Sequence, residues 1–272
     1  MAYALITKVL SRAHVPLVVD WLDFLGEQPS RIVAYLPDGG TGDEIAEDLR
    51  LATSLGGALV EIRALPDEDL KNEELAILHR LMSGTEEEWI VTVNLDTLPH
   101  REGHEGWLPA VIERLDREDF LFYSGTGMLF AADEPIGDGT FLRTQRFSNN
   151  FAVIRRKDWM TMQDAFPADQ VATRFISEAA IEHYAWCNDR WGLRRRDTSD
   201  FRVFHVQQWG DALFEVRTAF KRGDGIDQHM NKIWEDTDYL WERHYRYPRP
   251  SRLKLFRIAV GKTRRRLFSS KA

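Results

Sequence analysis

The first hundred residues alternate short apolar runs with longer stretches of helical periodicity, and this alternation limits the possible folds. Strands are predicted over 3–10, 31–36, 58–62 and 89–93, and helices over 15–25, 45–55 and 67–82. Strands that alternate with helices pair in parallel, because each helix crosses one face of the sheet on the way to the next strand. The sequence therefore predicts an α/β fold, a single Rossmann-like domain with a mostly parallel central sheet.

The second half continues this pattern and then changes character near residue 210. Strands are predicted over 120–123, 147–156 and 201–206, and helices over 107–116, 157–165 and 177–190. The first domain is therefore assigned to residues 1–210, and residues 211–272 are expected to form a helical extension. Within it, residues 251–270 interleave apolar side chains with Arg and Lys. Such a basic amphipathic tail could lie on an anionic membrane surface, and docking on the protein's own core or on a partner is the alternative.

Charge and cysteine content exclude several classes of protein. The net charge of −7 argues against a nucleic-acid-binding protein. The single cysteine, Cys187, excludes an internal disulfide, fits a reducing cytoplasm and is expected to be buried on its helix. Residues 1–10 are not expected to form a signal peptide, and no apolar run approaches the roughly 20 residues that span a bilayer. We expect a cytoplasmic protein, peripheral at the inner face of the membrane if the tail binds lipid.

The stretch from Glu88 to Pro99 is the strongest candidate for a site. A buried strand, 89–93, leads directly into Asn94 and Asp96. In open α/β folds, ligands bind at the carboxyl ends of the strands, which is where these side chains would lie. On an extended chain, residues two apart point to the same side, so both oxygens could face one cation. Alternatively, Asn-x-Asp before Pro99 is a turn that caps the next helix.

A glycine-rich loop follows the second predicted strand. Asp38 and Gly39 begin this loop, which continues to Glu44. Glycines let the backbone approach a ligand closely, and Asp38 could bind a ribose or a base. The alternative is a turn that leads to a helix capped by Thr41 or Asp43 and needs no ligand.

Four more polar residues stand near the ends of predicted elements. Asn149 and Asn150 lie at the mouth of a strand, where they could bind sugar hydroxyls or simply close a turn. Glu178 lies in the first turn of a helix, whose positive end favours an ionised carboxylate. Such a carboxylate could act as a base or lie beside a metal ion. Alternatively, it only stabilises the helix dipole. His205 ends the last strand and is a structural residue unless it acts together with Asp96.

Taken in order, these motifs resemble those of the GT-A fold glycosyltransferases of the family-two type. The resemblance spans roughly residues 3–210, with the typical glycine expected to end the 177–190 helix. The matching stretches are Ile32–Asp43, Val91–Asp96, Ser148–Arg156, Ser177–Glu178, Gly192 and Val203–His205. Two positions depart from the family pattern. Asn94 replaces the first Asp of the usual Asp-x-Asp, and Ser177-Glu178 replaces Glu-Asp, which leaves Glu178 as the remaining candidate base.

The resemblance implies a metal-dependent transfer of a sugar from a nucleotide-diphosphate donor to a hydroxyl of a glycan or lipid-linked acceptor, with inversion. It implies that Asp96 holds Mn²⁺ or Mg²⁺, with His205 as a second ligand, and that Glu178 is the catalytic base. Nucleotide binding then falls to Asp38, Gly39 and Asn94, and sugar binding to Asn149 and Asn150.

Two other functions fit the same sequence. One is a non-catalytic binding or scaffold protein that keeps the fold. The other is a nucleotidyltransferase, against which we note the lack of a glycine-rich, lysine-containing first loop to bind a triphosphate.

Overall fold

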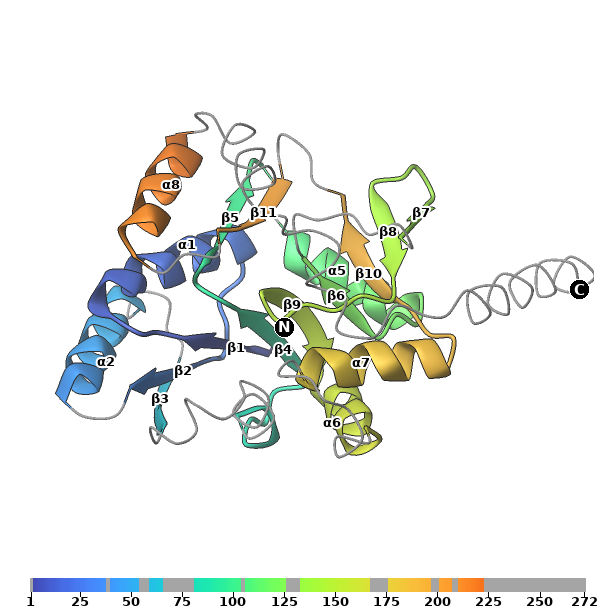
Figure 1. Ribbon diagram of the computed structural model, residues 1–272, viewed down its shortest axis with the longest axis horizontal. Coiled ribbons are helices and arrows are strands. Elements are labelled where there is room, and N and C mark those ends of the chain that lie inside the picture. Colours follow the sequence, from blue (N-terminus) through green and yellow to red (C-terminus); the bar gives the residue numbers. More distant parts are fainter. Residues whose placement is uncertain are drawn as a thin grey trace, which may run out of the picture. The chain divides into compact units, whose positions relative to one another are not determined.

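The computed structural model of the 272-residue chain describes residues 2–37, 40–53, 59–65, 81–103, 106–125, 133–166, 176–196, 201–206 and 210–222. Strands and helices alternate along these residues (Figure 1). The helices are η1 (Arg12–His14), α1 (Val15–Leu25), α2 (Gly40–Thr53), α5 (Trp107–Arg117), α6 (Arg156–Asp164), α7 (Ile176–Cys187) and α8 (Asp211–Arg222).

A nine-stranded sheet with the order β3-β2-β1-β4-β9-β6-β10-β8-β7 forms the centre. Its strands are β1 (Tyr3–Lys8), β2 (Arg31–Pro37), β3 (Leu59–Leu65), β4 (Trp89–Val93), β6 (Phe122–Ser124), β7 (Glu134–Ile136), β8 (Phe141–Thr144), β9 (Phe151–Arg155) and β10 (Gly192–Arg195). Only β8 and β9 run against the other strands. The predicted α/β fold with a mostly parallel central sheet is confirmed.

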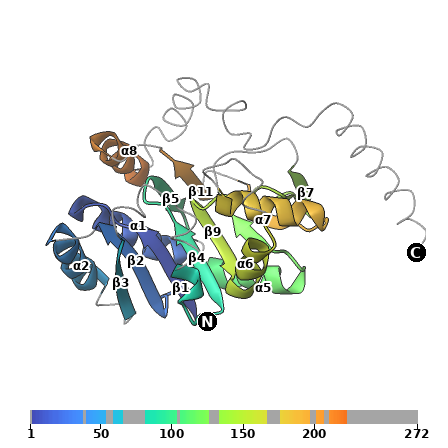
Figure 2. The same ribbon diagram turned by 60° about the horizontal axis from the view of Figure 1, so that its bottom comes forward.

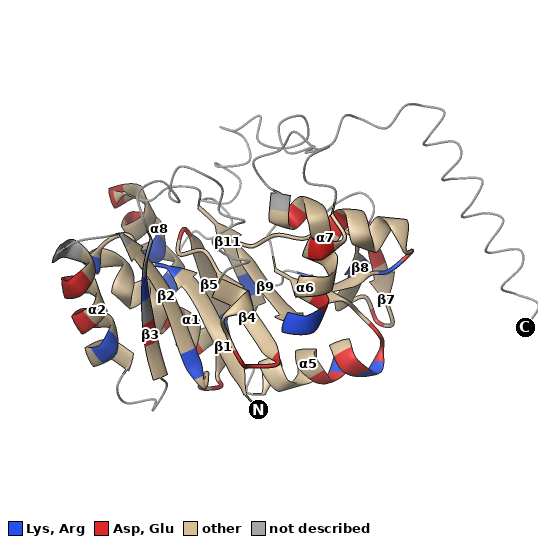
Figure 3. Ribbon diagram, turned by 90° about the horizontal axis from the view of Figure 1, so that it is seen from below, with Lys and Arg blue, Asp and Glu red and all other residues tan. Residues whose placement is uncertain are grey.

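Apolar side chains cover both faces of the sheet. On one face, Trp159 of α6 and Ile181 of α7 pack in one buried cluster with strand residues such as Ile90. On the other face, Trp21 of α1 and Trp107 of α5 both contact the ring of Phe151. Figure 2 shows α6 and α7 beside β9, and Figure 3 shows acidic residues along α2 and α5 while the central strands are mostly uncharged. Burial on both faces explains why these strands are continuous apolar runs rather than alternating ones.

A second, two-stranded sheet pairs β5 (Thr97–Arg101) with β11 (Phe201–His205) in antiparallel register. Pro99 lies inside β5, opposite Val203. Residues 94–96 form a turn between β4 and β5, in which the Thr97 N–H donates to the Asn94 carbonyl over 3.0 Å. The expectation of an extended chain through Asn94 and Asp96 was therefore wrong, and the turn leads to a strand rather than to a helix.

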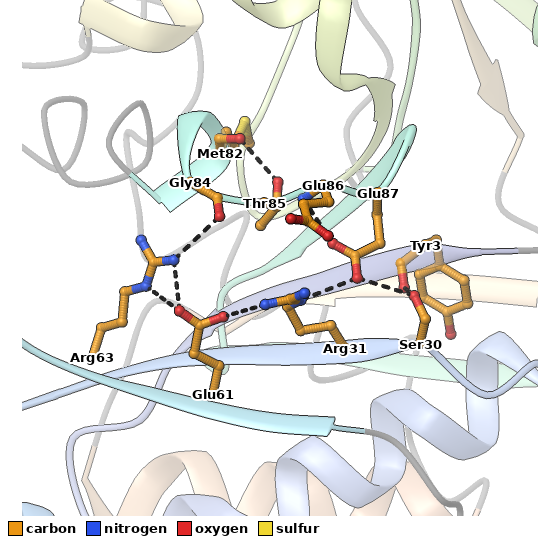
Figure 4. A network of polar contacts seen from close by, with 10 residues as sticks. All are labelled: Tyr3, Ser30, Arg31, Glu61, Arg63, Met82, Gly84, Thr85, Glu86 and Glu87. Carbon is orange, nitrogen blue, oxygen red and sulfur yellow. Dashed lines mark hydrogen bonds and ion pairs between the residues drawn. The ribbon is translucent and has the colours of Figure 1, made fainter.

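A network of ion pairs connects β2 and β3 to the segment before β4 (Figure 4). The Arg31 guanidinium contacts Glu61 of β3 at 2.7 Å and Glu87, just before β4, at 3.0 Å. Arg63 also binds Glu61 and reaches the Gly84 carbonyl. Burial opposes ionisation of Glu61, but the hydrogen bonds from Arg31 and Arg63 prevail and lower its pKa. This network holds β3, an edge strand, to the segment that precedes β4.

Two expectations about the end of α7 were wrong. The helix ends at Cys187, and the chain leaves it through Asp189, which has a positive φ of 55°. Gly192 is therefore not the helix exit but the first residue of β10, where a Cβ atom would lie 2.0 Å from the ring of Phe122. Cys187 is exposed rather than buried, with its Sγ 3.5 Å from Nε2 of His183.

The chain divides into two compact units, Met1–Met230 and Asn231–Ala272. The helix α8 belongs to the first unit, where Arg217 and Lys221 both bind the carboxylate of Asp20. The rest of the predicted helical extension, including the basic tail at 251–270, lies outside the described residues. Within the described part of the chain, every helix is too short or too polar to cross a membrane.

Candidate functional site

The turn at residues 94–96 buries an acidic side chain at the carboxyl end of β4. Asp96 is only 6% exposed, and its apolar neighbours Leu95 and Leu98 anchor the turn in the core. The backbone carbonyl of Asp96 accepts a hydrogen bond from the Val206 N–H over 2.8 Å. The turn is thereby fixed to the end of β11.

Pairing of β5 with β11 brings Asp96 and His205 together, although 109 positions separate them. His205 lies opposite Thr97 in the register, and its Nε2 is 3.0 Å from Oδ2 of Asp96. The second carboxylate oxygen, Oδ1, is buried and has no hydrogen-bond partner among the described residues. Because buried polar atoms are normally paired, an oxygen of this kind marks a position where a further donor or a cation can bind.

Asn150 connects this pair to Asn94. Its Oδ1 accepts a hydrogen bond from Asn94 Nδ2 over 3.0 Å, and its Nδ2 lies 2.9 Å from His205 Nδ1. Its backbone carbonyl also accepts from the Asn94 N–H. With these amide assignments, Nδ1 of His205 is an acceptor and Nε2–H donates to Asp96. Asn94, Asn150, His205 and Asp96 thus form one continuous hydrogen-bonded chain, and the side-chain amide of Asn150 is used within the protein.

Asn149 faces the other way, toward α7. Its N–H donates to Oε1 of Glu178 over 2.8 Å, and its Nδ2 donates to Oγ of Ser177 over 2.9 Å. Glu178 is 4% exposed and lies in the first turn of α7, as predicted. The Oδ1 of Asn149 is buried without a hydrogen-bond partner in the described part of the chain. Two neighbouring asparagines therefore join the predicted carboxylate on α7 to the Asp96–His205 pair.

Sequence reasoning missed Ser177 as a partner of Asn149, and it missed Glu182 and Arg146 altogether. Glu182 is buried one turn beyond Glu178 on α7, and its carboxylate binds Arg146 at 2.9 Å. Burial raises the pKa of Glu182, and the Arg146 guanidinium opposes that shift. The four-residue spacing of two acids on one helix face could have flagged Glu182, but nothing in the local sequence indicated Arg146.

Two of the predicted nucleotide-binding residues, Asp38 and Gly39, lie outside the described residues, between β2 and α2. The described residues also contain no group of three or more His, Cys, Asp and Glu side chains that could hold a metal ion. Asp96 and His205 form a pair instead. The carboxylate oxygen of Asp96 that lacks a partner among the described residues fits Mg²⁺ or Mn²⁺, which take their remaining ligands from water and substrate phosphates. Both ring nitrogens of His205 are hydrogen-bonded, so the imidazole can join as a ligand only when it gives up one of these bonds.

No protein-family model and no curated protein sequence matches the chain. Similar solved structures include a UDP-glucose pyrophosphorylase from Acinetobacter baumanii, with a TM-score of 0.52 and 10% identity over 87% of this chain and 100% of that one. A UDP-glucose pyrophosphorylase complexed with UDP-glucose has a TM-score of 0.50 and 6% identity over 87% and 100%. The mannosyltransferase PcManGT from Pyrobaculum calidifontis, in complex with GDP-Man and Mn²⁺, has a TM-score of 0.49 and 14% identity over 86% of this chain and 64% of that one. The likeness to the two pyrophosphorylases shows that the chain shares their fold.

Proposed function

We propose that the protein is a metal-dependent glycosyltransferase that moves a sugar from a nucleotide-diphosphate donor to a hydroxyl of a glycan or lipid-linked acceptor. The observation that carries this proposal is the buried carboxylate of Asp96 at the carboxyl end of β4, with His205 on one oxygen and no hydrogen-bond partner among the described residues on the other. A buried polar atom left unpaired costs about 1–3 kcal/mol. Destabilising features of this kind are expected at functional sites. This oxygen lies at the carboxyl end of a strand, where α/β folds bind their ligands.

In the proposed reaction, the departing nucleoside diphosphate develops negative charge. When bound, Mn²⁺ or Mg²⁺ supplies the positive charge that neutralises it. Asp96 would hold that cation, and His205 would join it as a second ligand by releasing one of its two hydrogen bonds, to Asn150 or to Asp96. Asn94 would contact the nucleotide beside the cation. Asp38 and Gly39 are proposed to bind the base or ribose.

Glu178 is proposed as the base that takes the proton of the acceptor hydroxyl. The amino end of α7 favours the ionised carboxylate that this role needs. The hydrogen bond from the Asn149 N–H fixes the orientation of the carboxylate. A single displacement with one base inverts the configuration at the sugar carbon. The buried Oδ1 of Asn149 is proposed to accept a hydrogen bond from a sugar hydroxyl.

A nucleotidyltransferase is the second candidate, and the fold shared with two UDP-glucose pyrophosphorylases favours it. The loop after β1 argues against it. This loop contains no glycine, and its Arg12 binds the carboxylates of Asp48 and Glu44 instead of pointing freely toward a triphosphate. A non-catalytic scaffold with the same fold is the third candidate.

The location of the protein also belongs to this proposal. We place it in the cytoplasm, with the basic tail at 251–270 as its contact with an anionic membrane. A membrane location would fit the lipid-linked class of acceptor.

Isothermal calorimetry and product analysis separate the three candidates. UDP- and GDP-sugars are titrated with and without Mn²⁺, and the same protein is then assayed for nucleoside diphosphate released in the presence of glycan or polyprenyl-phosphate acceptors. Metal-dependent binding together with acceptor-dependent release supports the glycosyltransferase. Pyrophosphate release from UTP and glucose 1-phosphate supports the nucleotidyltransferase, and absence of any binding heat supports the scaffold. Asp96→Ala and Glu178→Ala should abolish transfer while the fold persists.

A further inference from the structure

The segment 146–150, just before β9, is held almost entirely by side chains. Each of its five backbone N–H groups donates to a side-chain oxygen, where a strand would use the carbonyls of a neighbour. In chain order, the acceptors belong to Thr144, Glu182, Ser124, Glu178 and Ser148. Because backbone hydrogen bonds are obligatory in buried segments, these side chains decide where the segment lies.

Two of the acceptors come from α7 and are one helical turn apart. Glu178 accepts the Asn149 N–H over 2.8 Å, and Glu182 accepts the Phe147 N–H over 3.2 Å. Glu182 is 6% exposed, and its other oxygen binds Nη1 of Arg146 over 2.9 Å. The carboxylate of Glu182 therefore binds the segment at two successive residues, Arg146 and Phe147. Hydrogen bonds with ionised partners are roughly twice as strong as neutral ones, which makes this contact the firmest one at the start of the segment.

The segment ends at Asn150, which binds two of the predicted site residues, Asn94 and His205. The carbonyl and the side chain of Asn150 bind Asn94, and its amide group binds His205. A shift of the segment would therefore move His205 relative to Asp96. A shift of about 1 Å in a catalytic group can lower the rate about a hundredfold.

We propose that Glu182, together with Arg146, is a positioning residue for the site. It fixes the segment 146–150 on α7 and so sets the place of Asn150, and through Asn150 the place of His205 beside Asp96. Its kinetic consequences rest on the proposed function, whereas its structural consequences do not. The competing role for Glu182 is purely structural, namely holding α7 against the sheet with no effect on the site.

Substitutions of Glu182 separate these two roles. Glu182→Gln keeps an oxygen that can accept the Phe147 N–H, whereas Glu182→Ala removes it. We expect kcat to fall at least tenfold in Glu182→Ala and less than threefold in Glu182→Gln, with the donor KM changed less than kcat. The assay temperature lies well below the melting temperature of each variant. Glu113→Ala is the matched control, since Glu113 pairs with Arg117 on the exposed face of α5, and its kcat should stay unchanged.

The proposal is overturned if folded Glu182→Ala turns over at the wild-type rate. If Glu182→Ala does not fold, Glu182→Asp keeps the charge but withdraws the carboxylate by one methylene from the Phe147 N–H. We expect at least a fivefold fall in kcat for that variant, and a wild-type kcat would again refute the positioning role.

Nuclear magnetic resonance gives a readout that does not depend on turnover. In Glu182→Ala, the side-chain amide signals of Asn150 and the ring signals of His205 should shift, and the backbone N–H of Asn149 should exchange faster with solvent. In Glu113→Ala they should not change. If the wild-type protein transfers no sugar but these signals shift, the proposed function fails and the positioning role stands. If transfer occurs and the signals do not move in Glu182→Ala, the positioning role fails alone.

Discussion

Replacing Asp96 with Asn tests the proposed cation site most directly. In the absence of metal, the variant exchanges a charge-assisted hydrogen bond to His205 for a neutral one, a loss of about 1 kcal/mol. Removal of a buried negative charge, one oxygen of which has no partner among the described residues, offsets part of that loss. At about 2–4 °C per kcal/mol for a chain of this size, the melting temperature of the metal-free variant should lie within about 4 °C of the wild type.

The response to metal should differ much more. A ligand at about a hundredfold excess over its Kd stabilises the folded state by about 2.7 kcal/mol. Wild-type protein with Mn²⁺ and a nucleotide sugar should therefore melt about 5–11 °C higher than without them. In Asp96→Asn, the carboxylate that would bind the cation is gone, and we expect that increase to fall below about 2 °C.

A thermal unfolding series with and without Mn²⁺ measures both effects. Glu102→Gln is the matched control, because Glu102 lies beside a histidine, His100, at 3.7 Å but is 73% exposed in its side chain. The control should keep the full wild-type response. An Asp96→Asn variant that is stabilised by Mn²⁺ as much as the wild type would refute the assignment of Asp96 as a ligand.

Three further predictions concern packing, proton linkage and the attachment of α8. Gly192→Ala should lower stability by about 1–3 kcal/mol in urea unfolding, because its Cβ would lie 2.0 Å from the ring of Phe122. Burial raises the pKa of Glu182 above 4.5 in the folded protein. The protonated side chain therefore adds to the free energy of unfolding below that pH, and this contribution is lost as the pH rises through the folded-state pKa. The stability of wild type relative to Glu182→Gln should therefore fall with rising pH in unfolding curves. Arg217→Ala leaves the nearly buried carboxylate of Asp20 with Lys221 as its partner, and should lower stability by about 1–2 kcal/mol in the same assay.

Each of these predictions has its own contradicting result. Gly210→Ala controls for the loss of glycine, since nothing lies within 4 Å of its added Cβ, and equal losses in both glycine variants would exclude the clash as the cause. A pH-independent stability difference for Glu182→Gln would mean that the proton affinity of Glu182 is the same in the folded and unfolded states. An unchanged unfolding curve for Arg217→Ala would show that the ion pair with Asp20 contributes nothing to the attachment of α8.

Three different structural features place three residues of the candidate site. Asp96 is placed by a turn, His205 by the pairing of β5 with β11, and Glu178 by the first turn of α7. Asn149 and Asn150 join these parts because consecutive side chains of an irregular segment can point in different directions.

Local sequence determined the elements of the fold. The helix predicted at 15–25 is α1, residue for residue, because its apolar side chains recur on one face, Pro16 fits the first turn, and the chain leaves it through Gly26 at a φ of 70°. The apolar run at 89–93 became β4, and Glu178 occupies the predicted first turn of α7. These features depend on interactions between residues a few positions apart, and such interactions can be read directly from the sequence.

The tertiary structure alone decided how the site is assembled. Asp96 and His205 meet because β11 pairs with β5, and Pro99, which suggested the end of an element, lies inside that pairing. Glu182 and Arg146 gained their roles only when α7 packed beside the segment before β9. Contacts between residues far apart in the chain depend on which surfaces bury each other, and neither composition nor periodicity records that choice. The sequence therefore supplied candidate residues such as Asp96 and His205, and packing decided which of them touch and added Glu182 and Arg146 beside them.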